Sequence, residues 1–205
     1  MDIVQNLQDA EILVNELESS DLNTRSKAID ALSTAGEADI INFLISLLRK
    51  NSHRLVKEGV CKALGKIGNK KAIDILVESL DNEHESVRYQ ATIALGKIGD
   101  KNAVPHLLEI LKKKDDPLVR SEAAKALGII GDPSSLKLLL TMLRKDEDRF
   151  IRYHAVTSLG RIGDKKATKD IQKLLKESKD DRLKLRAIEA LEAIEKANRK
   201  QIVAG

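Results

Sequence analysis

The side chains with the widest catalytic repertoire are scarce in this chain. Its 205 residues include four histidines and one cysteine, which are His53, His84, His106, His154 and Cys61. A helical zinc site commonly uses two histidines four residues apart, and no two histidines here have that spacing. One cysteine can build neither an internal disulfide nor a site of several thiolates. We therefore predict no metal and no cofactor, and we expect the histidines to be exposed to solvent or to cap helices.

The composition is that of a folded protein in water. Hydrophobic residues make up 42% of the chain and charged residues 33%, which is too apolar for a disordered chain and too charged for a membrane-embedded one. No run approaches the roughly 18 consecutive apolar residues of a membrane span. The first residues, MDIVQNLQDAE, are acidic, whereas a signal peptide begins with basic residues. We expect a cytoplasmic protein whose mature chain is the whole chain.

One sequence motif recurs about every 32 residues. Four copies align without gaps: VKEGVCKALGKIGN (56–69), VRYQATIALGKIGD (87–100), VRSEAAKALGIIGD (119–132) and IRYHAVTSLGRIGD (151–164). A weaker copy precedes them at 24–37, and a degraded copy follows at 183–196. The shared leucine stands at Leu32, Leu64, Leu95, Leu127, Leu159 and Leu191. A fixed period of this length indicates a repeat architecture.

Each repeat is predicted to form two helices. Apolar residues with helical spacing mark both helices in one copy, at Val87, Ala91, Ala94, Leu95 and Ile98, and then at Val104, Leu107, Leu108 and Leu111. A glycine with positive φ is expected to close the first helix, at Gly99, Gly131 and Gly163. The aspartate after each glycine is expected to cap the second helix, at Asp100, Asp132 and Asp164.

A further glycine lies inside each first helix, where it costs about 1 kcal/mol relative to alanine. It directly follows the recurring leucine, at Gly65, Gly96, Gly128 and Gly160. We attribute it to a close approach by a neighbouring helix or turn, which a Cβ atom would prevent. Because a pair of short helices cannot bury its apolar faces alone, the pairs are predicted to stack side by side.

The pattern Ala-Leu-Gly, Ile-Gly-Asp and a leucine-rich second helix resembles the HEAT repeat in its short, phycobilisome-lyase-like form, over about residues 21–195. The resemblance implies an all-α, armadillo-like fold, an α-α superhelix or HEAT-like solenoid. We predict a single domain, 1–205, with an N-terminal cap helix at 2–19, five helix pairs and a C-terminal cap helix at about 181–201. The expected repeats are 21–52, 53–83, 84–115, 116–147 and 148–179. Both cap helices are expected to present a polar outer face.

A cation opens each first helix, at Arg25, Lys57, Arg88, Arg120, Arg152 and Lys184. A positive charge is unfavourable at a helix N-terminus, so a partner should offset it. We expect a structural ladder of ion pairs with acids at the repeat junctions, such as Asp116, Asp148 and Asp180, as the resemblance also implies. The alternative is a row of anion-binding sites.

Two catalytic relatives are alternatives within the family that the chain resembles. Deoxyhypusine hydroxylase holds two irons with His-Glu dyads that directly follow the recurring arginine. The corresponding pairs here contain no such dyad: Glu58-Gly59, Tyr89-Gln90, Ser121-Glu122 and Tyr153-His154. A bilin lyase subunit is the other alternative, and it implies no local catalytic motif. Cys61 is interpreted as a packing residue, and we predict that the protein is not an enzyme.

Nucleic-acid binding is a further alternative, based on charge. The net charge of +4 divides into −6 for residues 1–21 and +10 for the remainder, which permits weak contact with phosphates. Only four residues are aromatic, at Phe43, Tyr89, Phe150 and Tyr153, and there is no tryptophan, so few rings could stack on bases.

The second helices carry apolar side chains outside their core stripe. These candidate partner-binding residues are Phe43, Leu47, Ile75, His106, Ile110, Leu138, Met142 and Leu174. The resemblance implies that second helices line the concave side, where such residues could hold a partner segment. The alternative for Leu47, Ile110, Met142 and Leu174 is packing between repeats. We therefore predict a non-catalytic scaffold or adaptor that binds a protein of unknown identity through its concave face, with Phe43, Ile75 and Leu138 as the strongest candidates.

Overall fold

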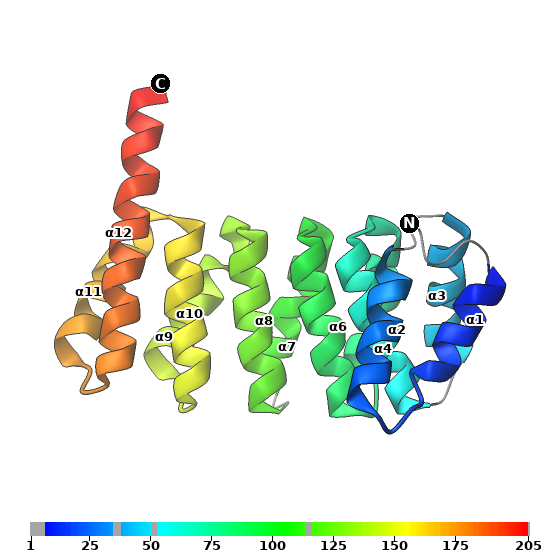
Figure 1. The fold of residues 1–205 in the computed structure, drawn as a ribbon. Coiled ribbons are helices and arrows are strands. Elements are labelled where there is room, and N and C mark those ends of the chain that lie inside the picture. The colour runs from blue at the N-terminus through cyan, green and yellow to red at the C-terminus, as the bar shows by residue number, and fades with distance from the viewer. Residues whose placement is uncertain (1–6, 35–37, 51–52, 114–115, 205) are drawn as a thin grey trace. The chain divides into compact units, whose positions relative to one another are not determined.

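The computed structural model describes residues 7–34, 38–50, 53–113 and 116–204. All regular structure within these ranges is helical (Figure 1), which confirms the all-α prediction. The described chain forms two compact units, residues 1–103 and residues 104–205. The repeat predicted at 84–115 therefore has its two helices in different units. A single domain over 1–205 stays a prediction.

The first unit contains the N-terminal helix and the first helices of three repeats. Its elements are α1 (Leu7–Glu16), α2 (Leu22–Thr34), α3 (Ala38–Lys50), α4 (Arg54–Ile67), the 3₁₀ turn η1 (Lys70–Ala72), α5 (Ile73–Glu78), η2 (Ser79–Asp81), α6 (Glu85–Ile98) and η3 (Lys101–Ala103). Helices α2, α4 and α6 lie side by side in one layer, and α3 and α5 pack beside each other in the second (Figure 1).

The second unit repeats this two-layer arrangement. Its elements are α7 (Val104–Lys112), α8 (Pro117–Ile130), η4 (Pro133–Ser135), α9 (Leu136–Lys145), α10 (Arg149–Ile162), η5 (Lys165–Ala167), α11 (Thr168–Glu177) and α12 (Asp181–Ala204). Helices α8, α10 and α12 form one layer, while α9 and α11 contribute to the other (Figure 1). The recurring leucine is fully buried at Leu32, Leu64, Leu95, Leu127 and Leu159, where it belongs to the core, whereas Leu191 on α12 is half-buried.

The turn between the two helices of a repeat follows the predicted chemistry. Gly99, Gly131 and Gly163 have φ near 72°, a left-handed conformation that glycine adopts without a steric penalty. The N–H of Gly131 donates to the carbonyl of the recurring Leu127 at 3.0 Å and thereby closes the helix. The next residue, Asp132, accepts from the N–H of Ser134 at 2.8 Å. It therefore caps a short 3₁₀ turn, which then leads into the second helix that we expected it to cap directly.

The glycine inside the first helix marks a close approach between neighbouring first helices. A Cβ atom added at Gly128 on α8 would lie 2.6 Å from the Cα atom of Ser158 on α10. Gly65 and Gly160 have equivalent contacts with the backbone of the next first helix. Because backbone atoms cannot rotate away as side-chain ends can, the small residue is needed there, as predicted.

The ends of the chain differ from the expected polar caps. Residues 2–6 of the predicted first helix lie outside the described residues, and α1 ends at Glu16. Helix α12 runs from Asp181 to Ala204, beyond the predicted end, and continues past its neighbours (Figure 1). On it, Leu185 and Ile188 are 53% and 42% exposed. Ile188 occupies the same repeat position as Val156 on α10, which is buried. Helix α12 follows α10 in its layer, whereas no described helix follows α12.

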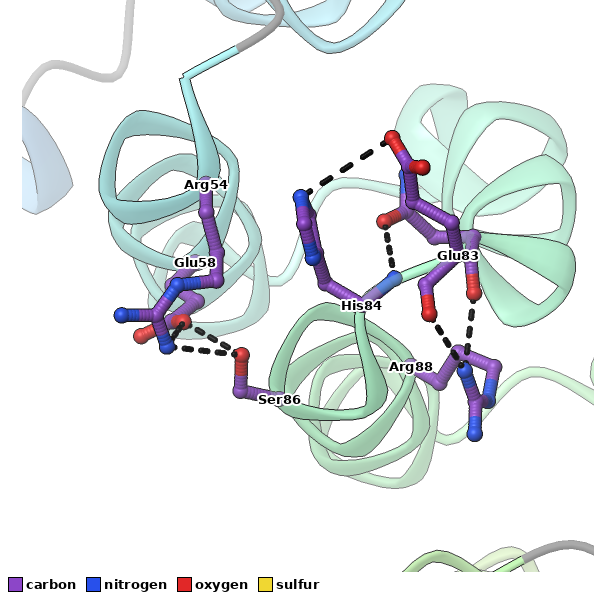
Figure 2. A network of polar contacts seen from close by, with 7 residues as sticks. Arg54, Glu58, Glu83, His84, Ser86 and Arg88 are labelled. Carbon is purple, nitrogen blue, oxygen red and sulfur yellow. Dashed lines mark hydrogen bonds and ion pairs between the residues drawn. The ribbon is translucent and has the colours of Figure 1, made fainter.

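The recurring cations bind main-chain carbonyls as well as acids, and the ion-pair ladder that we expected stays a prediction. Arg88 donates to the carbonyls of Asn82 and Glu83 at 2.9 and 3.2 Å (Figure 2), and Arg152 donates to that of Leu143 at 3.3 Å. Arg25 likewise donates to the carbonyl of Ser19. Carbonyls at the end of a helical segment lack partners within it, so a guanidinium can satisfy them.

The expected acidic partners serve mainly as N-caps. Asp148 accepts from the N–H of Phe150 at 2.7 Å, and Asp180 from that of Arg182 at 3.0 Å. Asp116 caps α8 in the same way, through the N–H of Leu118. An aspartate at this position satisfies N–H groups that the helix leaves free. Other acids also pair with these cations, for example Asp146 with Arg120 at 2.5 Å and Asp181 with Lys184 at 3.5 Å.

Cys61 is fully buried in α4, which confirms its interpretation as a packing residue. Burial raises the pKa of its thiol to about 12, so the nucleophilic thiolate is suppressed at neutral pH.

In the described ranges, no helix combines the length and the apolar character needed to cross a membrane.

Candidate functional site

The eight predicted partner-binding residues fall into two groups. Three are buried: Ile75 and Ile110 have exposed fractions of 2% and 1%, and Leu174 has 8%. The remaining five keep part of their surface accessible: Phe43, Leu47, His106, Leu138 and Met142. The packing alternative is therefore confirmed for Ile110 and Leu174.

The prediction that Ile75 lies on an accessible face is wrong. Ile75 lies in α5, a six-residue helix between two 3₁₀ turns, η1 and η2. Leu138 follows the 3₁₀ turn η4 at the equivalent position of a later repeat and stays partly accessible, so the repeat position alone does not decide whether this side chain is buried. Ile75 instead joins Ile73 and Leu76 in the core.

In the second unit, the ends of α9 and α11 form a groove with a volume of about 730 Å³. Leu143 and Leu174 provide apolar surface in it. Charged residues of both signs surround these leucines: Arg144, Lys145, Arg152, Asp170, Lys173, Glu177, Lys179 and Asp180. The mixture of apolar and charged lining suits a peptide chain better than a purely apolar ligand.

A fixed ion pair crosses this groove wall from one repeat to the next. Arg144 on α9 donates to both carboxylate oxygens of Asp170 on α11, at 2.7 and 2.6 Å. Hydrogen bonding from Arg144 lowers the pKa of Asp170, and the same contact raises the pKa of Arg144. The Arg144 side chain is 52% exposed, so about half of its surface stays accessible although two of its nitrogens donate to Asp170. A guanidinium that is fixed by an ion pair and still accessible can donate hydrogen bonds to acceptor groups of a partner.

Leu138 and Met142 lie one turn apart on α9, and both are partly accessible. The Sδ atom of Met142 is 3.7 Å from a guanidinium nitrogen of Arg120, which covers part of its surface. Leu138 and Met142 are thus the two partly accessible apolar contacts that the sequence identified on this helix. In the first unit, Phe43 and Leu47 have the same one-turn spacing on α3.

Sequence reasoning missed a set of exposed apolar residues on the first helices. The largest exposed fractions belong to Leu22 at 73%, Leu118 at 59% and Phe150 at 52%. Leu118 and Phe150 occupy equivalent repeat positions, directly before a buried core residue. Two bulky apolar residues at one non-core repeat position were the signal that could have revealed them.

The four histidines differ in environment. His53 and His84 stand at the N-caps of α4 and α6 without a side-chain capping bond, and His106 is exposed. His154 is half-buried on α10, which corrects the expectation that it would be exposed or capping. Its ring meets that of Tyr153 edge to face at 5.5 Å. Among the described residues, no group of three or more His, Cys, Asp or Glu side chains could hold a metal ion.

The half-buried His154 makes stability sensitive to acid. Burial lowers its pKa below the usual 6.5, with Lys125 and Arg161 acting in the same direction and Glu122 opposing them. The unfolded chain therefore binds a proton more readily, and stability is lost as pH falls from about 6.5 through the lowered pKa. We expect the melting temperature to fall more between about pH 7.5 and about pH 5 in the wild type than in His154→Gln. Equal losses in the two proteins would contradict this prediction.

Comparison with protein families finds a match to the family described as HEAT repeats, over residues 10–95, 79–155 and 139–203. The chain is also similar to solved structures. One engineered protein shares 25% identity over 92% of this chain and 97% of its own, with a TM-score of 0.60. A designed armadillo repeat protein in complex with the peptide (KR)4 shares 20% identity over 90% and 99%, with a TM-score of 0.59.

A third structure, the complex of CpcE and CpcF of phycocyanin lyase from Nostoc sp. PCC7120, has 22% identity over 90% of this chain and 94% of that one, with a TM-score of 0.45. No curated protein matches the chain.

Proposed function

The chain belongs to the HEAT-repeat family, whose members are all-α superhelices of stacked helix pairs. From this premise we propose that the protein is a non-catalytic scaffold that binds a partner protein through its second helices. The observation that carries the proposal is the groove at the ends of α9 and α11, where Arg144 is held in an accessible position by Asp170. The buried single cysteine suits a reducing compartment, so we place this scaffold in the cytoplasm.

The proposed partner is an extended peptide segment with both apolar and acidic side chains. Leu143 and Leu174 line the groove but keep only 2% and 8% of their surface exposed. Leu138 is a partly accessible apolar residue elsewhere on α9. The remaining N–H groups of Arg144 would donate to a carboxylate or a main-chain carbonyl of the segment. Ile75, Ile110 and Leu174 are too buried to make the major contacts, so Leu138, Met142 and, in the first unit, Phe43 and Leu47 remain the proposed apolar contacts.

Substitutions on α9 test this proposal. A displayed library of random peptides supplies the tightest-binding sequence, whose affinity is then measured with each variant by fluorescence anisotropy. We expect Arg144→Glu and Leu138→Glu each to weaken binding by about tenfold or more, because each removes a contact worth about 1.4 kcal/mol. Arg161→Glu, which makes the same change of charge at an exposed position of α10, should change the affinity by about twofold or less.

Two results would contradict the proposal. One is equal weakening by Arg144→Glu and Arg161→Glu, which would show only an effect of net charge. The other is unchanged affinity in both α9 variants, which would place the peptide on a different surface.

A further inference from the structure

A second groove lies on the first helices of the first unit and has a volume of about 550 Å³. Three helical stripes line it: Leu22, Arg25, Ser26 and Ile29 from α2, Glu58, Lys62 and Lys66 from α4, and Gln90, Ile93 and Lys97 from α6. The α4 stripe runs from Glu58 to Lys66, nine residues with a rise of about 12 Å along the helix axis. That length corresponds to between two and three turns of a bound helix.

The groove has apolar walls on both sides of the central helix. On the α2 side, Leu22 is 73% exposed, so most of this apolar side chain does not pack against the rest of the protein. Ile93 on α6 is half-buried, and Ile29 lies deeper in the wall with 8% exposed. Apolar surface of this kind favours a partner that also has an apolar face.

Lysines gather along the central helix and toward the ends of α4 and α6. Among the described residues, Lys62 and Lys97 form no ion pair, and Lys66 pairs with the exposed Asp30. The only acid lining the groove, Glu58, is already engaged, because it accepts from Arg54 at 3.2 Å and from Ser86 at 2.5 Å (Figure 2). The groove therefore presents excess positive charge.

Folding alone does not account for this charge. Lys66 and Lys97 stand in the last turns of their helices, where the helix dipole favours a cation. Lys62 lies one turn before Lys66 on the same face, and like charges at this spacing destabilise a helix by a few tenths of a kcal/mol. An acidic ligand would reverse that repulsion.

We propose that this groove binds an acidic amphipathic helix of another protein. The apolar face of that helix packs against Leu22 and Ile93, and its carboxylates meet Lys62 and Lys97. A nucleic acid fits less well, because no aromatic ring lines the groove and Glu58 would face the phosphates. This surface is built by α2, α4 and α6 and is independent of the peptide groove proposed on α9 and α11.

The test uses a fluorescein-labelled peptide of leucine and glutamate with helical spacing, whose affinity is measured by anisotropy. We expect the double variant Lys62→Glu/Lys97→Glu to weaken binding by about tenfold or more at low salt and by less at about 0.5 M salt. The matched control Lys137→Glu/Lys165→Glu carries the same charge change at exposed positions of the other unit and should change it by about twofold or less. Leu22→Ser should weaken binding at both salt concentrations, since its contact is apolar.

Several outcomes overturn the proposal, provided that circular dichroism shows each variant to be folded. They are the absence of peptide binding, equal weakening in the control variant, and an unchanged affinity in Leu22→Ser. Tighter binding of a single-stranded oligonucleotide, lost in Lys62→Glu/Lys97→Glu, would assign the groove to phosphates instead. If Arg144→Glu lost peptide binding and Lys62→Glu/Lys97→Glu kept it, this peptide would be assigned to the groove of α9 and α11.

Discussion

Gly128→Val is expected to lower the free energy of unfolding by about 3 kcal/mol or more, which is the upper end of overpacking effects. A Cβ atom at Gly128 would lie 2.6 Å from the Cα atom and 2.4 Å from the Cβ atom of Ser158, so α8 and α10 would have to separate. Separation would also break the buried hydrogen bond from the Ser158 hydroxyl to the carbonyl of Ala124, now 2.8 Å long. Urea unfolding followed by circular dichroism measures the change.

Gly131→Ala is the matched control for this prediction. Gly131 needs its left-handed φ of 72°, but a Cβ atom there would meet nothing within 4 Å. We therefore expect a loss of about 1 kcal/mol from backbone strain alone. If the two variants lost the same stability, the helix-internal glycine would not be present for close helix packing, and the stacking explanation would be wrong.

Ile75→Glu is expected to cost about 3 to 5 kcal/mol, whereas Leu138→Glu should cost about 1 kcal/mol or less. Ile75 is 2% exposed in the core of the first unit, beside the buried Ile73 and Leu76 on α5. A carboxylate placed there would lose its hydration. Leu138 is partly accessible on α9, so a glutamate can reach water there. The same unfolding measurement compares the two variants directly.

The contrast matters for interpreting binding experiments. Ile75→Glu would unfold the first unit, so any loss of binding in this variant would say nothing about a contact made by residue 75. Leu138→Glu would remain folded and would report on the surface itself. A stable Ile75→Glu protein would contradict the burial of this residue and restore it as a binding candidate.

Much of the fold could be predicted from the repeat alone. The spacing of the recurring leucine and the glycine after each first helix predicted the helix pairs, and Leu127 and Gly131 show both features as expected. These signals are local, because hydrophobic periodicity and a positive φ are properties of a short segment. The helix-internal glycine added one long-range prediction, a close backbone approach, which Gly128 and Ser158 confirm.

The candidate surfaces were predicted less well. The burial of Ile75 depends on how the first unit packs around α5, and the lysine groove depends on which faces of α2, α4 and α6 converge. The recurring arginines likewise found carbonyls of the preceding segment, as Arg152 does with Leu143. None of these arrangements is a property of one repeat read by itself.

The amino-acid sequence by itself determined the repeat length, the two helices of each repeat and the residues that cap and close them. These follow from backbone preferences and from apolar periodicity, which act over a few residues. Only the tertiary structure decided which side chains remain accessible, which charges converge and which acids serve as caps. Exposure and electrostatic convergence depend on the packing of helices from different repeats, as Lys62 on α4 and Lys97 on α6 show by lining one groove.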